Sequence, residues 1–433
     1  MDLRTWRSHL QEDQFTEILQ ALYGPCTDEQ IEENRERYRD LIEKFQAFYD
    51  VKEDEEISLF STPGRSEISG NHTDHQQGQV IACSVNLDII AAARKVEEPV
   101  IRVKSFEFEK IDEINIDDLS MQETERESSA AMIRGIASKL KEMDFDLGGC
   151  EIYTISRVPK GSGLSSSAAF EVMIVTILDK LFGAGDLPVL ERAKIAQYAE
   201  NHYFGKPSGL MDQSACAVGG LIHLDFEDPA DPQLYEIDVD FSDFGYDLII
   251  TECPGDHADL TDEYAAIPRE MKAVANELGQ DHLRPISLDK FMTALPDLHN
   301  EVSDRALLRA FHFITENHRV PELVEALEEK DLETFLDGIL SSGKSSWMYL
   351  QNLYDAKEPA FQSLAVGLMV SEALLKGEGA WRVHGGGFAG TVQAFVPHYL
   401  VETYRETMDK LFGEGKCQVL NIRPIGTICL DTL

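Results

Sequence analysis

The stretch Gly149–Phe182 reads G-C-E-I-Y-T-I-S-R-V-P-K-G-S-G-L-S-S-S-A-A-F-E-V-M-I-V-T-I-L-D-K-L-F and decides the fold. It predicts a strand at its start, a loop from Pro159 to Gly163, and a long apolar helix over 168–182. The glycines permit a tight turn, and the serines after them place hydroxyl and N–H groups at the positive end of the helix dipole. This order predicts an anion cradle, with a phosphate group as the expected occupant.

A Gly/Ser turn can also simply cap a helix, so the cradle alone does not establish phosphate binding. The sequence contains no P-loop NTPase, protein-kinase or Rossmann motif. The segment instead resembles the P-x-x-x-G-L-[SG]-S-[SA]-A loop of the GHMP family of small-metabolite kinases. The resemblance implies that nucleotide is bound by Gly161, Ser162, Gly163, Leu164, Ser165, Ser166, Ser167 and Ala168.

The length and composition of the chain limit the classes of protein to which it can belong. A chain of 433 residues is expected to form two domains. The formal charge of −39 argues against nucleic-acid and anionic-membrane partners, so a phosphate site must be built locally. Seven scattered cysteines predict free thiols in a reducing cytoplasm. The N-terminus shows no signal sequence, and no apolar run is long enough to span a membrane.

The chain divides into three predicted regions. Residues 1–50 show the periodicity of two amphipathic helices, and a structural cap is favoured over a partner-binding arm. The range 51–230 carries the cradle and forms the expected N-terminal domain. An acidic, proline-containing shift at 225–233 marks the expected boundary, and 231–433 forms the C-terminal domain, opening with strands.

A second motif lies at 63–75, where P-G-R-S-E-I-S-G-N-H-T-D-H stands in a predicted loop. By composition alone this loop could be either a surface turn or a site. It resembles the galactokinase signature P-G-R-V-N-L-I-G-E-H-T-D-Y within the GHMP family. The resemblance implies that Arg65 is catalytic and that Asn71, His72 and Asp74 bind a sugar.

A third segment, G-L-M-D-Q, places Asp212 in the first turn of a predicted helix, where the dipole favours the ionised carboxylate. It resembles the family segment that holds the catalytic aspartate, with Gly209 at the sugar. Mg²⁺ is implied at Ser167 and Glu200.

Two more resemblances come from the second half of the chain. H-A-D-L-T-D-E-Y at 257–264 implies that Tyr264 faces the sugar, and the glycines at 385–387 resemble the third family motif.

The resemblance implies an α+β, two-domain GHMP kinase fold. Its N-terminal domain would be like domain 2 of ribosomal protein S5, and its active site would lie in the interdomain cleft. The implied activity is ATP-dependent phosphorylation of a sugar at its anomeric hydroxyl, by a monomer or weak homo-oligomer that uses Mg²⁺.

Galactose is the first-choice substrate, but four positions depart from the galactokinase pattern and cluster where the sugar would be read. The departures are Glu67, Asn71, His75 and His384. A kinase for a sugar altered at C6, such as galacturonate, therefore remains open, as does a non-catalytic sugar sensor.

Overall fold

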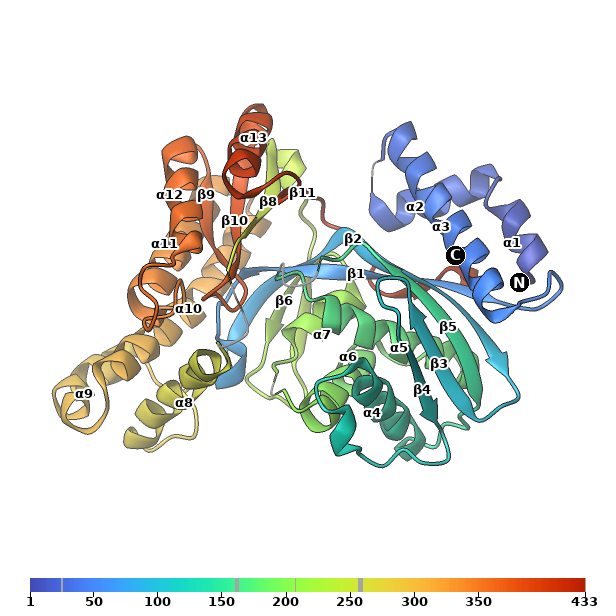
Figure 1. Cartoon of the computed structure of the whole chain (residues 1–433). Coiled ribbons are helices and arrows are strands. Elements are labelled where there is room, and N and C mark those ends of the chain that lie inside the picture. Colours follow the sequence, from blue (N-terminus) through green and yellow to red (C-terminus); the bar gives the residue numbers. More distant parts are fainter. Residues whose placement is uncertain (25, 160–162, 207, 256–259, 433) are drawn as a thin grey trace.

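A computed structural model describes the chain except for residues 25, 160–162, 207, 256–259 and 433. Two β-sheets organise the molecule, one of eight strands and one of four (Figure 1). Gly161 and Ser162, both expected to bind nucleotide, lie outside the described residues.

The larger sheet has the order β12-β1-β2-β5-β3-β4, and β6 and β7 continue from β2. The pairing of β3 with β5 is parallel, whereas the other registered pairs are antiparallel. Its strands are β1 (Ser58–Ser69), β2 (Gln79–Val96), β3 (Val100–Ser105), β4 (Ile111–Asn115), β5 (Gly149–Ser156), β6 (Leu221–Asp225), β7 (Gln233–Ile237) and β12 (Ile428–Cys429).

Strand β1 extends further than the sequence predicts. Arg65 and Glu67 were expected in a loop, but they lie on β1, opposite Ser84 and Ala82 of β2. The register shifts on either side of Arg65, and such bulges redirect side chains next to functional sites. The true loop is therefore shorter and runs from residue 70 to 78.

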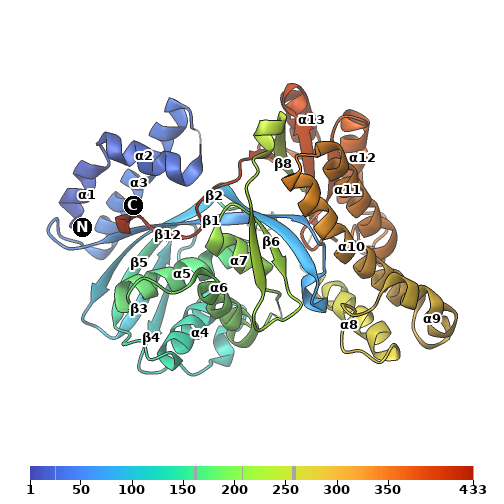
Figure 2. The ribbon, with the colours of Figure 1, turned by 180° about the vertical axis from the view of Figure 1, so that it is seen from behind.

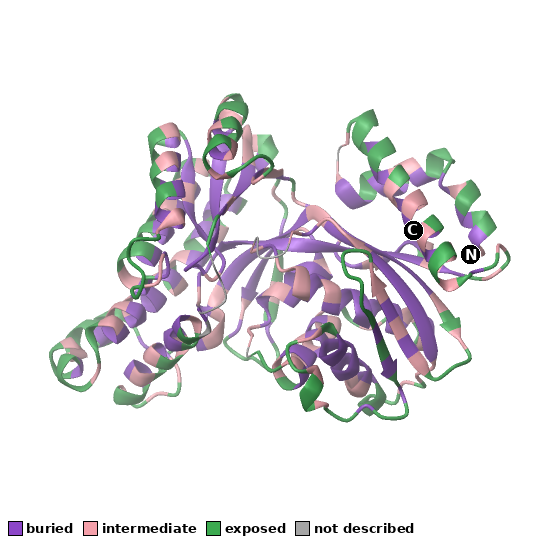
Figure 3. Cartoon of the chain, viewed as in Figure 1, coloured by how far each residue is buried: buried purple, intermediate pink, exposed green. Residues whose placement is uncertain are grey.

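Four helices cover one face of this sheet (Figures 1 and 3). They are α4 (Ser129–Glu142), α5 (Ser166–Phe182), α6 (Val189–Tyr198) and α7 (Met211–Val218). Helix α5 is buried along most of its length because apolar side chains occur on all its faces. The predicted strand and buried helix are thus confirmed as β5 and α5, whereas residues 160–162 of the predicted loop lie outside the described residues.

Three N-terminal helices cover the opposite face, as the view from behind also shows (Figure 2). They are α1 (Leu3–His9), α2 (Asp13–Tyr23) and α3 (Asp28–Tyr49). Alternate residues of β2 separate the two cores: Ala91 packs with α5, whereas Ile90 packs with the N-terminal helices. The two predicted amphipathic helices are confirmed as α2 and α3, and α1 is an additional short helix.

The smaller sheet has the order β11-β8-β10-β9. The strands of this sheet are β8 (Tyr246–Cys253), β9 (Ala380–His384), β10 (Gly390–Pro397) and β11 (Cys417–Leu420), and the helices of this part of the chain are α8 (Thr261–Glu277), α9 (Leu288–Glu301), α10 (Asp304–Glu328), α11 (Leu332–Ser345), α12 (Ser363–Leu375) and α13 (Val401–Phe412). Helices α11, α12 and α13 pack against the sheet, whereas α8 and α9 pack against α10.

The division between the sheets does not follow the chain in simple order. Strand β7 was expected to open the second half, but it pairs with β6 in the larger sheet. The final strand, β12, also returns to the larger sheet and pairs with β1. Both chain ends therefore lie beside the N-terminal helices (Figure 1).

Among the described residues, no helix combines the length and apolar character needed to cross a membrane. All seven cysteines are free thiols, as the sequence predicts.

Candidate active site

An ion pair joins the motif on β1 to the motif at the start of α7. Arg65 on β1 meets Asp212 in the first turn of α7 through two parallel hydrogen bonds, Nε to Oδ1 and Nη2 to Oδ2, each 2.7 Å. Burial raises the pKa of Asp212, but the Arg65 charge and the hydrogen bonds outweigh it, so this pKa lies below its usual range. Asp212 is therefore ionised at neutral pH, as the sequence predicts.

The cradle loop is fastened to this ion pair. The Ser165 hydroxyl donates to the Asp212 carboxylate, and the Arg65 guanidinium donates to the carbonyl oxygen of Gly163. The Arg65 backbone N–H also donates to the Leu164 carbonyl oxygen at 3.1 Å. Ser165 has a φ of +53° just before α5 begins, a strained conformation of the kind that clusters at functional sites.

His384, one of the departures from the family pattern, packs against the cradle loop at Gly163. Its Nε2 accepts the Glu67 backbone N–H at 3.2 Å, so its Nδ1 carries the proton and donates to Thr391 Oγ1 at 2.8 Å. A Cβ atom on Gly163 would lie only 2.8 Å from this Nδ1. Burial, reinforced by Arg65, lowers the pKa of His384 well below its usual value. The neutral imidazole of His384 thus lies so close to the backbone at position 163 that only glycine fits there.

The glycine turn at 385–387 meets the loop 70–78, as the third motif predicts. His72 Nε2 lies 3.0 Å from the Gly386 carbonyl oxygen, and the Tyr264 hydroxyl donates to Gly387 O at 2.7 Å. Burial raises the pKa of Tyr264 to about 12, so its hydroxyl stays protonated. Two of the predicted sugar-binding residues, His72 and Tyr264, therefore contact the same turn.

Asp74 and Gly209 lie directly against each other. A Cβ atom on Gly209 would fall 1.6 Å from Asp74 Oδ2, which excludes any side chain at position 209. Burial raises the pKa of Asp74, while His72 opposes that effect and Asp212 adds to it. The structure thus brings the two predicted sugar-binding residues together near Asp212.

Asn71 has a different environment from the one expected. Its side chain is fully buried. Its Nδ2 donates to Glu67 Oε1 at 3.0 Å and to Gly385 O at 2.6 Å, and its Oδ1 accepts from Ser346 Oγ and Asn352 Nδ2 at 3.3 and 3.0 Å. These bonds use the whole capacity of a carboxamide. A contact between Asn71 and a sugar would therefore require one of them to break.

A second polar cluster surrounds Glu200, one of the two residues expected at Mg²⁺. Glu200 lies in a π-helical turn, Ala199–Phe204, and is almost completely buried. It accepts from Lys206 Nζ at 3.1 Å, Ser208 Oγ at 2.6 Å and Gln213 Nε2 at 2.8 Å.

Glu171 adds a carboxylate that the sequence reasoning missed. It lies one turn along α5 from Ser167, and its Oε2 accepts from Gln213 Nε2 at 3.2 Å. Its buried Oε1 has no hydrogen-bond partner. Burial, together with the Glu200 charge, raises the pKa of Glu171 well above its usual range. An unpaired oxygen beside a second carboxylate fits a hard cation such as Mg²⁺.

Lys206 was also missed, although the G-K-P-S-G break at 205–209 marked an irregular segment. It is the ammonium partner of the buried Glu200, with a side chain that is 59% exposed. The sequence could have pointed to Lys206, because it is a cation only a few residues before Asp212 in a chain of strong negative charge.

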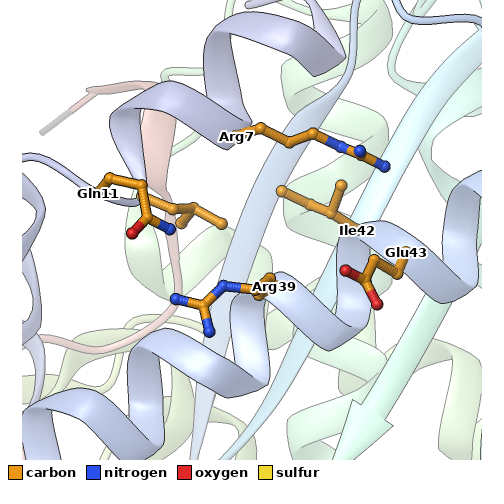
Figure 4. A pocket seen from close by; sticks show the side chains of 6 residues that line it. Arg7, Gln11, Arg39, Ile42 and Glu43 are labelled. Atoms are coloured by element: carbon orange, nitrogen blue, oxygen red, sulfur yellow. The ribbon is translucent and has the colours of Figure 1, made fainter.

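Two cavities lie outside the clusters described above. One, of about 190 Å³ between α1 and α3, is lined by Arg7, Leu10, Gln11, Arg39, Ile42 and Glu43 (Figure 4). The other, of about 330 Å³, borders Phe388 beside the glycine turn. Neither is lined by the predicted catalytic pair.

Comparison with known proteins gives the class. The family model described as "GHMP kinases N terminal domain" matches residues 131–220, and the "Galactokinase galactose-binding signature" matches 43–95. The crystal structure of Lactococcus lactis galactokinase complexed with galactose superposes with a TM-score of 0.78 at 24% identity, covering 91% of this chain and all of that one. Methanococcus jannaschii mevalonate kinase gives 0.59 at 16% identity, covering 86% and 99%. The fold is that of a GHMP kinase.

Proteins of similar sequence identify the family within this class. The galactokinase of Streptococcus suis is 31% identical over 381 residues, which cover 85% of this chain and 92% of the relative. That of Streptomyces coelicolor is 29% identical over 371 residues, covering 86% and 92%. The chain belongs to the galactokinase family of GHMP kinases.

Proposed function

We propose that this protein transfers the γ-phosphoryl group of ATP to the anomeric hydroxyl of a sugar, with galactose as the first-choice substrate. The observation that carries the proposal is the Arg65–Asp212 pair, which is fastened to the cradle by Ser165. It places an ionised carboxylate and a fixed cation beside a loop suited to phosphate. Family membership supports the same reaction.

Phosphoryl transfer depends mainly on positioning and on charge neutralisation. Asp212 orients the sugar hydroxyl and accepts its proton, because its carboxylate stays ionised between Arg65 and Ser165. Arg65 offsets the charge that develops on the transferred group. The N–H groups at the start of α5 hold the phosphates.

Mg²⁺ would supply charge neutralisation at the phosphate oxygens. Ser167 and Glu200 would hold it, with Glu171 as the neighbouring carboxylate. Because Mg²⁺ is usually held by one or two carboxylates together with substrate phosphates, this small donor set is sufficient.

The sugar would lie among Asp74, His72, Gly209 and Tyr264, next to Asp212. Asp74 can accept from two adjacent hydroxyl groups, and Tyr264 supplies a phenol. A sugar altered at C6 remains the second candidate, because Asn71 replaces the glutamate of the family signature. A sensor without turnover is less well supported, since Arg65, Asp212 and the serines of the cradle are all retained.

The test is an ATP-consumption assay over hexoses, pentoses and uronic acids, with Asp212→Asn as the catalytic control. We expect galactose to give the highest kcat/KM. Asp212→Asn should lower kcat by roughly two to four orders of magnitude while nucleotide binding, measured by calorimetry, survives. Near-normal turnover by this variant would remove Asp212 from the mechanism, and no turnover of any sugar by the wild type would favour the sensor.

A further inference from the structure

The two ends of the cradle loop are held by different parts of the chain. At its C-terminal end, Gly163, Leu164 and Ser165 bind the Arg65–Asp212 pair. The N-terminal end follows β5, which finishes at Ser156. The residues that hold this end set where the chain enters the loop.

Arg157, the first residue after β5, is held by the N-terminal helices. Its backbone N–H donates to the Asp88 carbonyl oxygen at 2.8 Å. Its guanidinium reaches Glu33 Oε1 at 2.6 Å and Asn34 Oδ1 at 3.4 Å, both on α3. The start of the loop is therefore tied to a helix that lies more than one hundred residues earlier in the chain.

The side chain of Asp88 docks the same helices at the same place. This fully buried carboxylate accepts from Tyr23 at 2.6 Å and Arg37 at 2.8 Å, from α2 and α3. It also accepts from Ser61 of β1 at 2.6 Å and from Arg423 near the C-terminus at 3.2 Å. Removing one cation from such a cluster leaves a buried charge poorly compensated. The helices are thus fixed at Asp88, immediately beside Arg157.

We propose that the N-terminal helical unit, α1 to α3, positions the nucleotide-binding loop, with Arg157 as the positioning residue. The apolar core that these helices share with β1, β2 and β5 explains how they cap the sheet. That core does not require an ion pair at the first residue after β5. The inference rests on the proposed function only in taking this loop as the nucleotide site.

The Glu33–Arg157 contact allows positioning to be separated from folding. The two side chains are 59% and 32% exposed, and exposed ion pairs contribute little to stability. Small displacements of a positioning group can nevertheless weaken function strongly. Neutralising this pair should therefore change nucleotide binding more than it changes the melting temperature.

The experiment compares Glu33→Gln and Arg157→Gln with the control Glu32→Gln. Glu32 lies on the same helix but pairs with Arg35 and Arg39 of that helix. We expect Glu33→Gln to weaken binding of a non-hydrolysable ATP analogue about two- to fivefold, and Arg157→Gln about five- to twentyfold. Hydrogen exchange in the peptide over 157–166 should accelerate. The Tm and the sugar KM should stay at wild-type values, as should every property of Glu32→Gln.

Wild-type nucleotide affinity and wild-type exchange in Glu33→Gln would overturn the inference and leave the helices as a cap. If Arg157→Gln does not fold, Glu33→Gln decides the question, because its partner stays in place. A wild-type protein that binds the analogue but phosphorylates no sugar would refute the proposed function alone. Unchanged variants of an active wild type would refute the positioning role alone.

Discussion

At the scale of single residues, the segment 63–75 differs from the galactokinase signature by a reciprocal exchange. The signature has asparagine at position 67 and glutamate at position 71, whereas this chain has Glu67 and Asn71. The two side chains are bonded to each other at 3.0 Å, and Glu67 also pairs with the buried Arg382 at 2.6 Å. The signature has its carboxylate at position 71, whereas this chain has it at position 67 of the same contact pair. There the positive charge of Arg382 compensates it.

This exchange predicts the effect of Asn71→Glu. The substitution removes the two N–H donors to Glu67 and Gly385 and places a second buried carboxylate beside Glu67. Because an uncompensated buried charge typically costs about 3–5 kcal/mol, the free energy of unfolding should fall by roughly that amount in a denaturant titration.

The double variant Glu67→Asn/Asn71→Glu restores the arrangement of the family signature and should recover part of the lost stability, because only one carboxylate is then buried in the contact pair. A single variant as stable as the wild type but with a changed sugar preference would show instead that Asn71 faces the substrate.

At the scale of elements, the π-helical turn Ala199–Phe204 and the break after it build the second polar cluster. Such turns are rare and often lie at functional sites. In this one, Gln213 of α7 donates to Glu200 and also to Glu171 of α5, so that it links the two carboxylates. Lys206 from the break then places an ammonium group on Glu200. The short irregular stretch 199–206 thus supplies both an anionic side chain, Glu200, and a cationic one, Lys206.

The position of Glu200 in this turn predicts how the activity depends on the Mg²⁺ concentration. Glu200→Gln should raise the Mg²⁺ concentration needed for half-maximal activity about tenfold or more, because it removes a charged ligand. Binding of Mn²⁺ with ATP, followed by electron paramagnetic resonance, should weaken in parallel. Glu191→Gln, on the exposed side of α6, is the matched control. Wild-type metal titrations for Glu200→Gln would exclude Glu200 from the metal site.

At the scale of the whole molecule, buried and half-buried histidines link stability to pH. Burial, with neighbouring histidines adding to it, lowers the pKa of the half-buried His72 to about 3 and that of the half-buried His75 to about 4. Burial likewise lowers the pKa values of the buried His223, His312 and His384. Below pH 6.5 the unfolded chain binds protons that the folded chain excludes. The stabilisation is therefore present above pH 6.5 and is lost as the pH falls toward the folded-state values.

Each such histidine should remove about 1.4 kcal/mol of stability per pH unit below 6.5. Thermal unfolding at pH 7.5, 6.5 and 5.5 should show a marked decrease in Tm between the last two values. His75→Gln should flatten this decrease, whereas His318→Gln, at a position 79% exposed, should not. A Tm that is constant over this range would contradict the neutral assignment.

The sequence by itself determined the local elements and the reaction class. The order of strand, Gly/Ser loop and apolar helix requires only neighbouring residues, because backbone freedom, capping and periodicity act over short ranges. The same holds for α2, for the capping box of α3, and for Asp212 at the start of α7. Short contiguous motifs also carried the resemblance to the family.

Only the tertiary structure decided how distant positions are paired. The bonds of Asn71, the close approach of His384 to Gly163, and the tie between α3 and Arg157 each join residues far apart in the chain. The pairing of β7 with β6 and the return of β12 to β1 are of the same kind. Composition and periodicity do not encode such partners, because burial and hydrogen-bond satisfaction are settled only when the elements pack together.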